Sequence, residues 1–226
     1  MGEITGKKYD TVVFDMDGTL LDTLEDLRDA VNYALRMHGM PERTTEEIRR
    51  FVGNGVRKLL VRSVPEGDKN PEFEAVFQAF REYYAVHSND KTHAYKGVTE
   101  LLKKLRDAGY AVAIVSNKPD AAVKNLNQIY FDGIVETAIG EREGMDKKPA
   151  PDMVWKAIEE LGKTKETAVY VGDSEVDIET ARNAGLPCIS VLWGFRERDF
   201  LAARGAQVFA EAPEEVWMLL EEGKLP

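Results

Sequence analysis

The chain of 226 residues contains a single cysteine, Cys188, and therefore cannot form an internal disulfide. It also lacks any apolar run near the roughly 18 residues that a membrane-spanning helix needs. Its first ten residues hold no apolar core of the kind found in signal peptides. Free cysteines are often small buried residues, which is how we interpret Cys188. These absences lead us to expect a soluble, cytoplasmic protein with no membrane partner.

Positive charge is also scarce. Lysine and arginine number 30 against 40 aspartate and glutamate residues, which gives a net charge of -10 and no basic stripe. Nucleic-acid binding relies on such a stripe, so we expect no partner of that class. A metal cation or a small anionic ligand remains compatible with the composition, because local charge in a site can oppose the net charge.

Strand-like and helix-like patterns alternate along most of the chain. Helical patterns such as VTELLKKLRDAGY and SEVDIETARNAG each close with glycine, a frequent helix C-terminus. Between such stretches lie short runs rich in Val, Ile and aromatic residues, as strands buried on both faces should be. These runs are residues 11–17, 110–116, 168–173, 188–194 and 206–210, with 136–140 as a weaker sixth. The alternation predicts a doubly wound parallel α/β sheet, that is, a Rossmann-like core.

One interval departs from this alternation. Residues 21–95 show several helical patterns and no convincing strand. We therefore predict an all-helical cap inserted after the first strand, at residues 21–95. The catalytic core would then comprise residues 1–20 and 96–226.

Two acids, Asp15 and Asp17, directly follow the apolar run Val12-Val13-Phe14. Like charges this close at the end of a buried strand repel each other and lose hydration, a cost that pairing or a metal ion usually offsets. Ligands of open parallel sheets bind beyond the carboxyl ends of the strands. We expect one site at that edge of the sheet, because further polar side chains follow other predicted strands: Ser116, Asn117 and Asp173.

The acids also predict the kind of cation. Asp15, Asp173 and Asp177 offer carboxylate oxygens, and no Cys/His cluster provides a soft-metal alternative. Mg²⁺ typically combines one or two carboxylates with substrate phosphate and water, and would relieve the repulsion between the acids. A lysine could then hold phosphate oxygens. Lys148 is favoured over Lys147 by its spacing to the prolines that follow.

Four stretches together resemble the motifs of the haloacid dehalogenase superfamily, in order and context. They are DMDGT at 15–19, the apolar run ending in Ser116, KPAP beginning at Lys148, and GDSEVD at 172–177. The second acid of the first motif is similar to that of the phosphatase branch. FVGNGVRKLL, SNKP and GDSEVDIETARNAG further resemble phosphoglycolate phosphatases. The resemblance implies a Mg²⁺-dependent phosphatase of a small phosphorylated metabolite, with phosphoglycolate as the leading substrate.

The resemblance also implies roles for individual residues. Asp15 would attack phosphorus, and Asp17 would protonate the leaving oxygen and then activate water. Mg²⁺ would be held by the Asp15 carboxylate, the Asp17 backbone carbonyl and Asp173. The remaining core residues would act around these: Ser116 and Lys148 on phosphoryl oxygens, Asn117 as a secondary phosphate contact, Thr19 in support of the phosphate loop, and Asp177 in orienting the lysine or a metal-bound water.

The cap sequence leaves more open. The turn Gly53-Asn54-Gly55 by default only joins two helices, although its backbone amides could face the substrate if the cap closes. Arg57 or Lys58 could pair with a substrate carboxylate, or could be an ordinary exposed cation at a helix start. An aromatic set between Phe73 and Tyr84 fits a packed helix face better than a ligand cage.

Several alternative functions share these motifs. A phosphosugar mutase resembling β-phosphoglucomutase would pass the phosphoryl group to a second hydroxyl instead of to water. A pyrophosphatase or nucleotidase of the same superfamily would differ at the cap. Phosphonate hydrolysis would require a Schiff-base lysine, for which Lys58 is the candidate, and a signalling receiver domain would have no need of a helical insertion. The sequence is compatible with a monomer or a homodimer.

Overall fold

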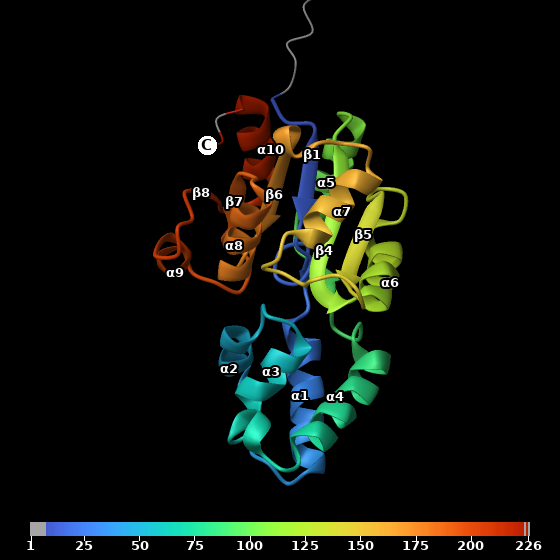
Figure 1. The fold of residues 1–226 in the computed structure, drawn as a ribbon, viewed down its shortest axis with the longest axis vertical. Coiled ribbons are helices and arrows are strands. Elements are labelled where there is room, and N and C mark those ends of the chain that lie inside the picture. The colour runs from blue at the N-terminus through green and yellow to red at the C-terminus, as the bar shows by residue number, and fades with distance from the viewer. Residues whose placement is uncertain (1–7, 224, 226) are drawn as a thin grey trace, which may run out of the picture.

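A computed structural model describes residues 8–223 and 225. Its core is a sheet of six parallel strands in the order β5-β4-β1-β6-β7-β8 (Figure 1). All six predicted strands are present, so the predicted doubly wound sheet is confirmed. Their bounds are β1 Thr11–Phe14, β4 Ala111–Pro119, β5 Thr137–Glu141, β6 Ala168–Gly172, β7 Cys188–Val191 and β8 Val208–Ala210. The N-terminal residues that we searched for a signal peptide lie largely outside the described part of the chain.

Helices cover both faces of this sheet. Successive residues of β1 point to opposite faces, as strand geometry requires: Val12 and Phe14 belong to one apolar cluster and Val13 to another. The first cluster includes α5 (Val98–Asp107), α6 (Asp120–Phe131) and α10 (Pro213–Glu222), and the second includes α7 (Asp152–Glu160) and α8 (Glu175–Ala184). A short helix, α9 (Arg198–Ala202), connects β7 to β8. No helix among the described residues is long and apolar enough to cross a membrane.

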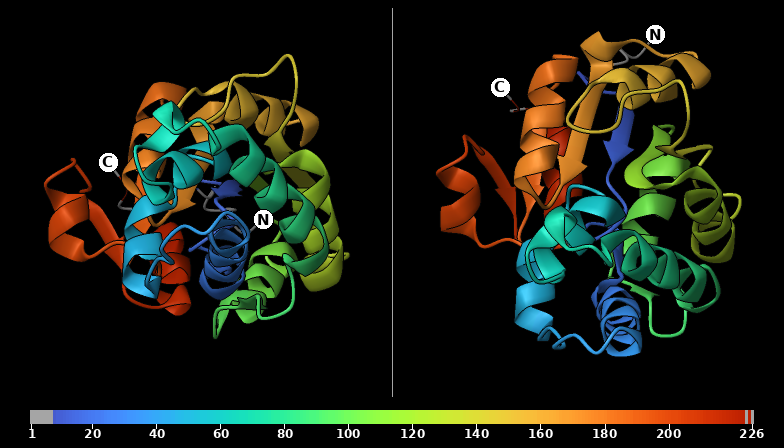
Figure 2. Two further views of the ribbon diagram at one scale, coloured as in Figure 1. Left: turned by 90° about the horizontal axis from the view of Figure 1, so that it is seen from below. Right: turned by 60° about the horizontal axis from the view of Figure 1, so that its bottom comes forward.

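Four helices lie below the carboxyl edge of the sheet in Figure 1. They are α1 Leu24–Met37, α2 Thr45–Phe51, α3 Val56–Ser63 and α4 Phe73–His87, with a short 3-10 turn at Gly67–Lys69. The buried faces of these helices form an apolar cluster of their own, separate from the two clusters of the sheet. We propose on this ground that residues 21–95 form the cap and that the remainder forms the core. Figure 2 shows the cap helices in front of the sheet edge when that end of the molecule is turned forward.

The expectation that the cap interval contains no strand was wrong at its two ends. Leu21–Asp22 (β2) and His93–Ala94 (β3) pair as a two-stranded antiparallel ribbon. The backbone N–H of Tyr95 extends this pairing by donating to the carbonyl of Leu20 at 3.1 Å. Segments of two residues are too short to show a strand period, and their pairing depends on residues far apart in the chain. The chain therefore enters and leaves the cap side by side.

A buried acid on the first cap helix holds the segment that comes just before β3. Asp26, on α1, is 3% exposed, and its carboxylate accepts hydrogen bonds from the backbone N–H groups of Lys91 and Thr92 and from the Thr92 hydroxyl at 2.7–3.1 Å. The segment that returns to the core is thus held on the first cap helix.

Replacing this acid should destabilise the protein. We expect Asp26→Ala to lower the free energy of unfolding by about 2–3 kcal/mol, because it leaves buried N–H donors without an acceptor. Asp29→Ala on the same helix removes a carboxylate that forms partly exposed ion pairs with Arg28 and Lys91, so we expect a loss below about 1 kcal/mol. Urea unfolding of both variants measures the difference, and equal losses would contradict the role given to Asp26.

Candidate active site

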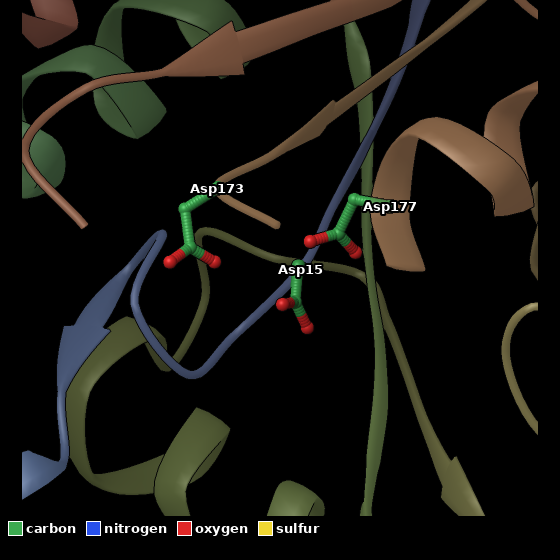
Figure 3. A group of neighbouring side chains, drawn as sticks. All are labelled: Asp15, Asp173 and Asp177. Atoms are coloured by element: carbon green, nitrogen blue, oxygen red, sulfur yellow. The ribbon is translucent and has the colours of Figure 1, made fainter. Parts of the chain in front are cut away.

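The strand register brings three acids together at the carboxyl edge of the sheet. β1 lies between β4 and β6, with Phe14 opposite both Ile114 and Val171. The residues that follow these strands must therefore meet. Carboxylate oxygens of Asp15, Asp173 and Asp177 lie within 4.8 Å of one another, and all three residues are buried. Figure 3 shows the three carboxylates directed toward a common space.

Lys148 is the cation within this cluster. Its Nζ lies 2.7 Å from Asp15 Oδ1 and 2.8 Å from Asp177 Oδ1, and it donates to the Tyr170 hydroxyl at 3.1 Å. Burial alone would lower the pKa of Lys148, but the two carboxylates outweigh burial and raise that pKa above its ordinary value. Lys147, the alternative left open by the sequence, is half exposed and pairs with Glu141 at 3.2 Å.

Asp177 has both oxygens occupied by protein groups. Oδ1 accepts from Lys148 and from the Tyr170 hydroxyl at 3.0 Å, while Oδ2 accepts from the backbone N–H and the hydroxyl of Ser174 at 3.1 and 2.6 Å. Of the two roles that the sequence left open, these contacts favour orientation of the lysine.

The electrostatics of the cluster fit a bound cation. Burial and the neighbouring Asp177 raise the pKa of Asp15 well above its usual range, although Lys148 opposes this. The same two causes raise the pKa of Asp173 to about 7, against the hydrogen bond from the Phe195 N–H. Lys148 pairs with two of the three carboxylates, Asp15 and Asp177, so part of the buried negative charge lacks an ion-pair partner among the described residues. Because the donors are all oxygen atoms, the site suits a hard divalent cation that Asp15 and Asp173 would hold.

Asp17 occupies a different environment from Asp15. Its Oδ1 pairs with Lys118 Nζ at 3.0 Å, and its Oδ2 accepts from the Ser116 hydroxyl at 3.4 Å. Lys118 in turn donates to the hydroxyl of Tyr84, on cap helix α4, at 2.6 Å. Asp15 and Asp17, only two residues apart in the sequence, are therefore each paired with a different lysine.

Lys118 was missed by our sequence reasoning. It lies within SNKP, and its place in that motif did not indicate a role. The signal was available, because Lys118 follows a run of wholly buried residues in β4, and a lysine continuing such a run needs an anionic partner.

A cavity of about 470 Å³, part of it open to solvent, lies between this edge of the sheet and the cap. The predicted site residues that line it are Asp15, Asp17, Ser116, Asn117, Lys148 and Gly53. Asn117 donates from Nδ2 to the Lys148 carbonyl at 3.0 Å, while its buried Oδ1 has no partner among the described residues. The cap contributes the apolar side chains of Leu27, Val52, Val56 and Leu59, together with Gly53 and Gly55.

Three predicted substrate contacts do not line this cavity. Thr19 lies beneath it, with its hydroxyl 3.4 Å from Asp173 Oδ1. The side chain of Asn54 accepts a hydrogen bond from Arg62 instead. Arg57 is exposed, pairs with Glu74 and lies over the rings of Phe73 and Phe77. A helical pattern places Arg57 near a helix start but does not show which way it points, and here neighbouring side chains on the cap provide its partners.

The segment after β7 joins the acid cluster to the cap, and sequence reasoning did not anticipate it. The Phe195 N–H donates to Asp173 Oδ2 at 2.7 Å, while the Phe195 ring belongs to the apolar cluster of the cap. Arg196 donates to the carbonyls of Arg49 and Val52, at the end of α2, at 2.6 and 2.8 Å. The cap is thus docked on the core next to the turn that contains Gly53.

The sequence matches the family of haloacid dehalogenase-like hydrolases over residues 12–191. The chain belongs to this family. The resemblance seen in the four motifs is confirmed, and membership of a hydrolase family leaves no ground for the receiver-domain alternative.

Relatives of this hydrolase include proteins named phosphoglycolate phosphatase. One from Xanthomonas campestris is 34% identical over 91% of this chain and 94% of its own length. Another from Aquifex aeolicus is 32% identical over 81% of this chain and 85% of its own length. The crystal structure of a candidate phosphoglycolate phosphatase from Lactobacillus delbrueckii has a TM-score of 0.91 and 38% identity, and the match covers 95% of this chain and 99% of that one.

The acid cluster predicts how stability depends on pH and metal. The pKa of Asp173 is about 7 in the folded protein against an ordinary 3.8, so the folded state binds this proton more tightly than the unfolded state. In EDTA, the midpoint of thermal unfolding should therefore fall as pH rises from about 4 to about 7. Mg²⁺ should raise the midpoint by several degrees at pH 8 and little at pH 5, because protons compete for the same oxygens.

Asp173→Asn should remove most of the Mg²⁺-dependent rise and weaken the pH dependence, of which the raised pKa of Asp15 would retain part. The exposed acid Asp199 provides the control, since Asp199→Asn should leave both effects as in the parent protein. An undiminished Mg²⁺ effect in Asp173→Asn would contradict the assignment of this carboxylate to the metal.

Proposed function

We propose that this hydrolase is a Mg²⁺-dependent phosphatase that cleaves a small phosphate monoester through an aspartyl-phosphate intermediate, with 2-phosphoglycolate as the leading substrate. The observation that carries the proposal is that two acids at one cavity have different partners. Asp15 lies among Lys148 and the other acids, whereas Asp17 is paired with Lys118. Two acids with separate partners at one cavity can take the separate roles of nucleophile and proton donor.

The contacts of Asp15 leave one oxygen available for attack. Within the described chain, its ion pair with Lys148 and its hydrogen bond from the Met16 N–H, both at 2.7 Å, are made by Oδ1. Oδ2 would form the bond to phosphorus as the bond to the ester oxygen breaks, with the electron pair passing to that oxygen. Asp17 would give the departing oxygen a proton.

The second half of the reaction would return both acids to their starting states. Asp17, now a carboxylate, takes a proton from a water molecule as the water oxygen bonds to phosphorus. The bond between phosphorus and Asp15 Oδ2 then breaks and releases inorganic phosphate. Lys148 and the Ser116 hydroxyl would hold phosphoryl oxygens. When bound, Mg²⁺ supplies positive charge against the phosphoryl oxygens and would be held by Asp15, Asp173 and the Asp17 carbonyl.

The size and lining of the cavity support a small substrate. Only about 50 Å³ of its space can be reached by the centre of a water-sized sphere, well below the volume of a site for a drug-sized ligand. Apolar side chains on the cap offer no hydrogen-bonding partner to the hydroxyls of a sugar.

The relatives named phosphoglycolate phosphatase support the choice of phosphoglycolate. Structural similarity to a protein described as a β-phosphoglucomutase from Bacteroides vulgatus, at 19% identity, reflects a shared fold alone. Whether the enzyme is a monomer or a homodimer stays a prediction.

Phosphate release from a panel of small phosphate esters tests this proposal directly. We expect strong release with Mg²⁺, concentrated on 2-phosphoglycolate, and almost none after EDTA. Release from many esters at similar rates would support the chemistry but not the substrate. Failure to release phosphate from any member would contradict the proposed hydrolysis and favour transfer to a second hydroxyl, as in a mutase.

Substitution of the two acids tests their separate roles. Asp15→Asn should lower kcat by about 10⁴-fold or more, because it removes the nucleophile. Asp17→Asn should lower kcat by about 10²–10⁴-fold, the usual contribution of general acid–base catalysis. Circular dichroism would establish that both variants remain folded, with Asp199→Asn as the matched control. Near-normal turnover by Asp15→Asn would exclude Asp15 as the nucleophile.

A further inference from the structure

The cavity contains a second buried lysine that phosphoryl binding does not require. Lys148 and Lys118 are the cationic side chains that line the cavity, and Lys148 is committed to Asp15 and Asp177. The side chain of Lys118 is 2% exposed. Its ammonium has three N–H donors, of which one serves Asp17 and another serves the Tyr84 hydroxyl. One donor therefore remains for a ligand.

Tyr84 can add a second donor at the same point. Its oxygen accepts from Lys118, and in the described chain its own O–H has no other partner. The ring is buried and lies 4.9 Å from the Lys118 Nζ. Tyr84 belongs to cap helix α4 and Lys118 to core strand β4, so this pair of donors exists only where the cap is docked on the core.

The position of Lys118 and Tyr84 indicates which part of a substrate would contact them. Lys148 lies beside Asp15, where the phosphoryl group would bind. Lys118 lies 3.0 Å from Asp17, the acid that would protonate the leaving oxygen. An anionic group on the leaving alcohol, one carbon from the ester oxygen, would thus lie near Lys118. The other cap side chains that line the cavity are apolar, and Arg57, which the sequence offered for this purpose, pairs with Glu74 and is not among the lining residues.

We propose that Lys118 and Tyr84 form the binding site for a carboxylate attached next to the scissile ester. The enzyme would then select phosphate esters of 2-hydroxy acids, of which 2-phosphoglycolate is the smallest, over alkyl phosphates of the same length. This inference rests on the proposed phosphatase function and identifies the residues that make its substrate preference. Lys118 is at the same time a positioning residue for Asp17, so the experiment must separate these two effects.

A pair of substrates achieves that separation. 2-Phosphoglycolate and ethyl phosphate have the same chain length and differ in the carboxylate, so any effect through Asp17 applies to both. The parent enzyme should prefer 2-phosphoglycolate by about 100-fold in kcat/KM. Lys118→Met should reduce the preference to within about threefold, mainly by raising KM for 2-phosphoglycolate. Lys118→Arg should keep part of it, and Tyr84→Phe should reduce it by about tenfold. The exposed Lys69, also on the cap, supplies the control, since Lys69→Met should retain the full preference.

Equal losses on both esters in Lys118→Met would overturn the proposal and leave Lys118 only as the partner of Asp17. A parent enzyme that hydrolyses both esters equally well would overturn it too, while the phosphatase function would stand. Should Lys118→Met fail to fold, Lys118→Arg and Tyr84→Phe still decide the question.

Binding without turnover provides an independent measurement. 3-Phosphonopropionate has the shape of 2-phosphoglycolate with a carbon–phosphorus bond, and propylphosphonate lacks its carboxylate. In calorimetric titrations with Mg²⁺ present, the parent protein should bind 3-phosphonopropionate at least about tenfold more tightly, and Lys118→Met should lose this difference. If no ester is hydrolysed but the binding preference is found, the proposed function fails and the carboxylate site stands. If the preference is absent, the carboxylate site fails.

Discussion

The structure depends on negative charge that is buried where β1 and β6 end side by side. Asp15, Asp173 and Asp177 are buried together, and Lys148 forms ion pairs with two of them, Asp15 and Asp177. Such a cluster is tolerated only where hydrogen bonds and cations compensate it. The surrounding backbone accordingly comes unusually close. A side chain on Gly194 would place its Cβ 2.3 Å from the Gly18 carbonyl and 2.4 Å from the Asp173 Cβ. The loops at this edge are shaped around the acids.

The same constraint explains how the cap is held. Asp173 accepts the N–H of Phe195, and this fixes the segment whose next two groups, the Phe195 ring and the Arg196 guanidinium, reach the cap. Two adjacent residues, Phe195 and Arg196, therefore join a carboxylate suited to a cation to the cap that encloses the cavity. The cap has a second attachment at Lys118 and Tyr84, on the opposite acid. These two attachments end at groups of the candidate active site, whereas a further one, from the Tyr130 hydroxyl to Asn89 and the Thr92 carbonyl, does not.

The parts of this arrangement that could be predicted are those encoded locally. Apolar runs of strand length indicated all six strands of the sheet, and the acids at their ends indicated where the site lies, because parallel strands end at a common edge. Three other features could not be predicted, because each joins residues far apart in the chain. They are the ribbon of β2 and β3, the hydrogen bonds from Arg196 to the end of α2, and the pairing of Lys118 with Asp17. Nothing in the local pattern around Arg57 showed that it would face Phe73 and Glu74 and not the cavity.

The different surroundings of Asp15 and Asp17 follow from a single turn. Two residues apart in a regular strand, both side chains would point to the same face and repel each other. The strand β1 ends at Phe14, however, and Gly18 adopts a φ of 90°, which permits its N–H to reach the carbonyl of Leu21 at 2.9 Å. The turn directs Asp17 toward β4 and its lysine while Asp15 stays with Lys148. Any residue with a Cβ at position 18 would meet Asp173 at 2.4 Å, so the glycine in this turn leaves room for the third acid.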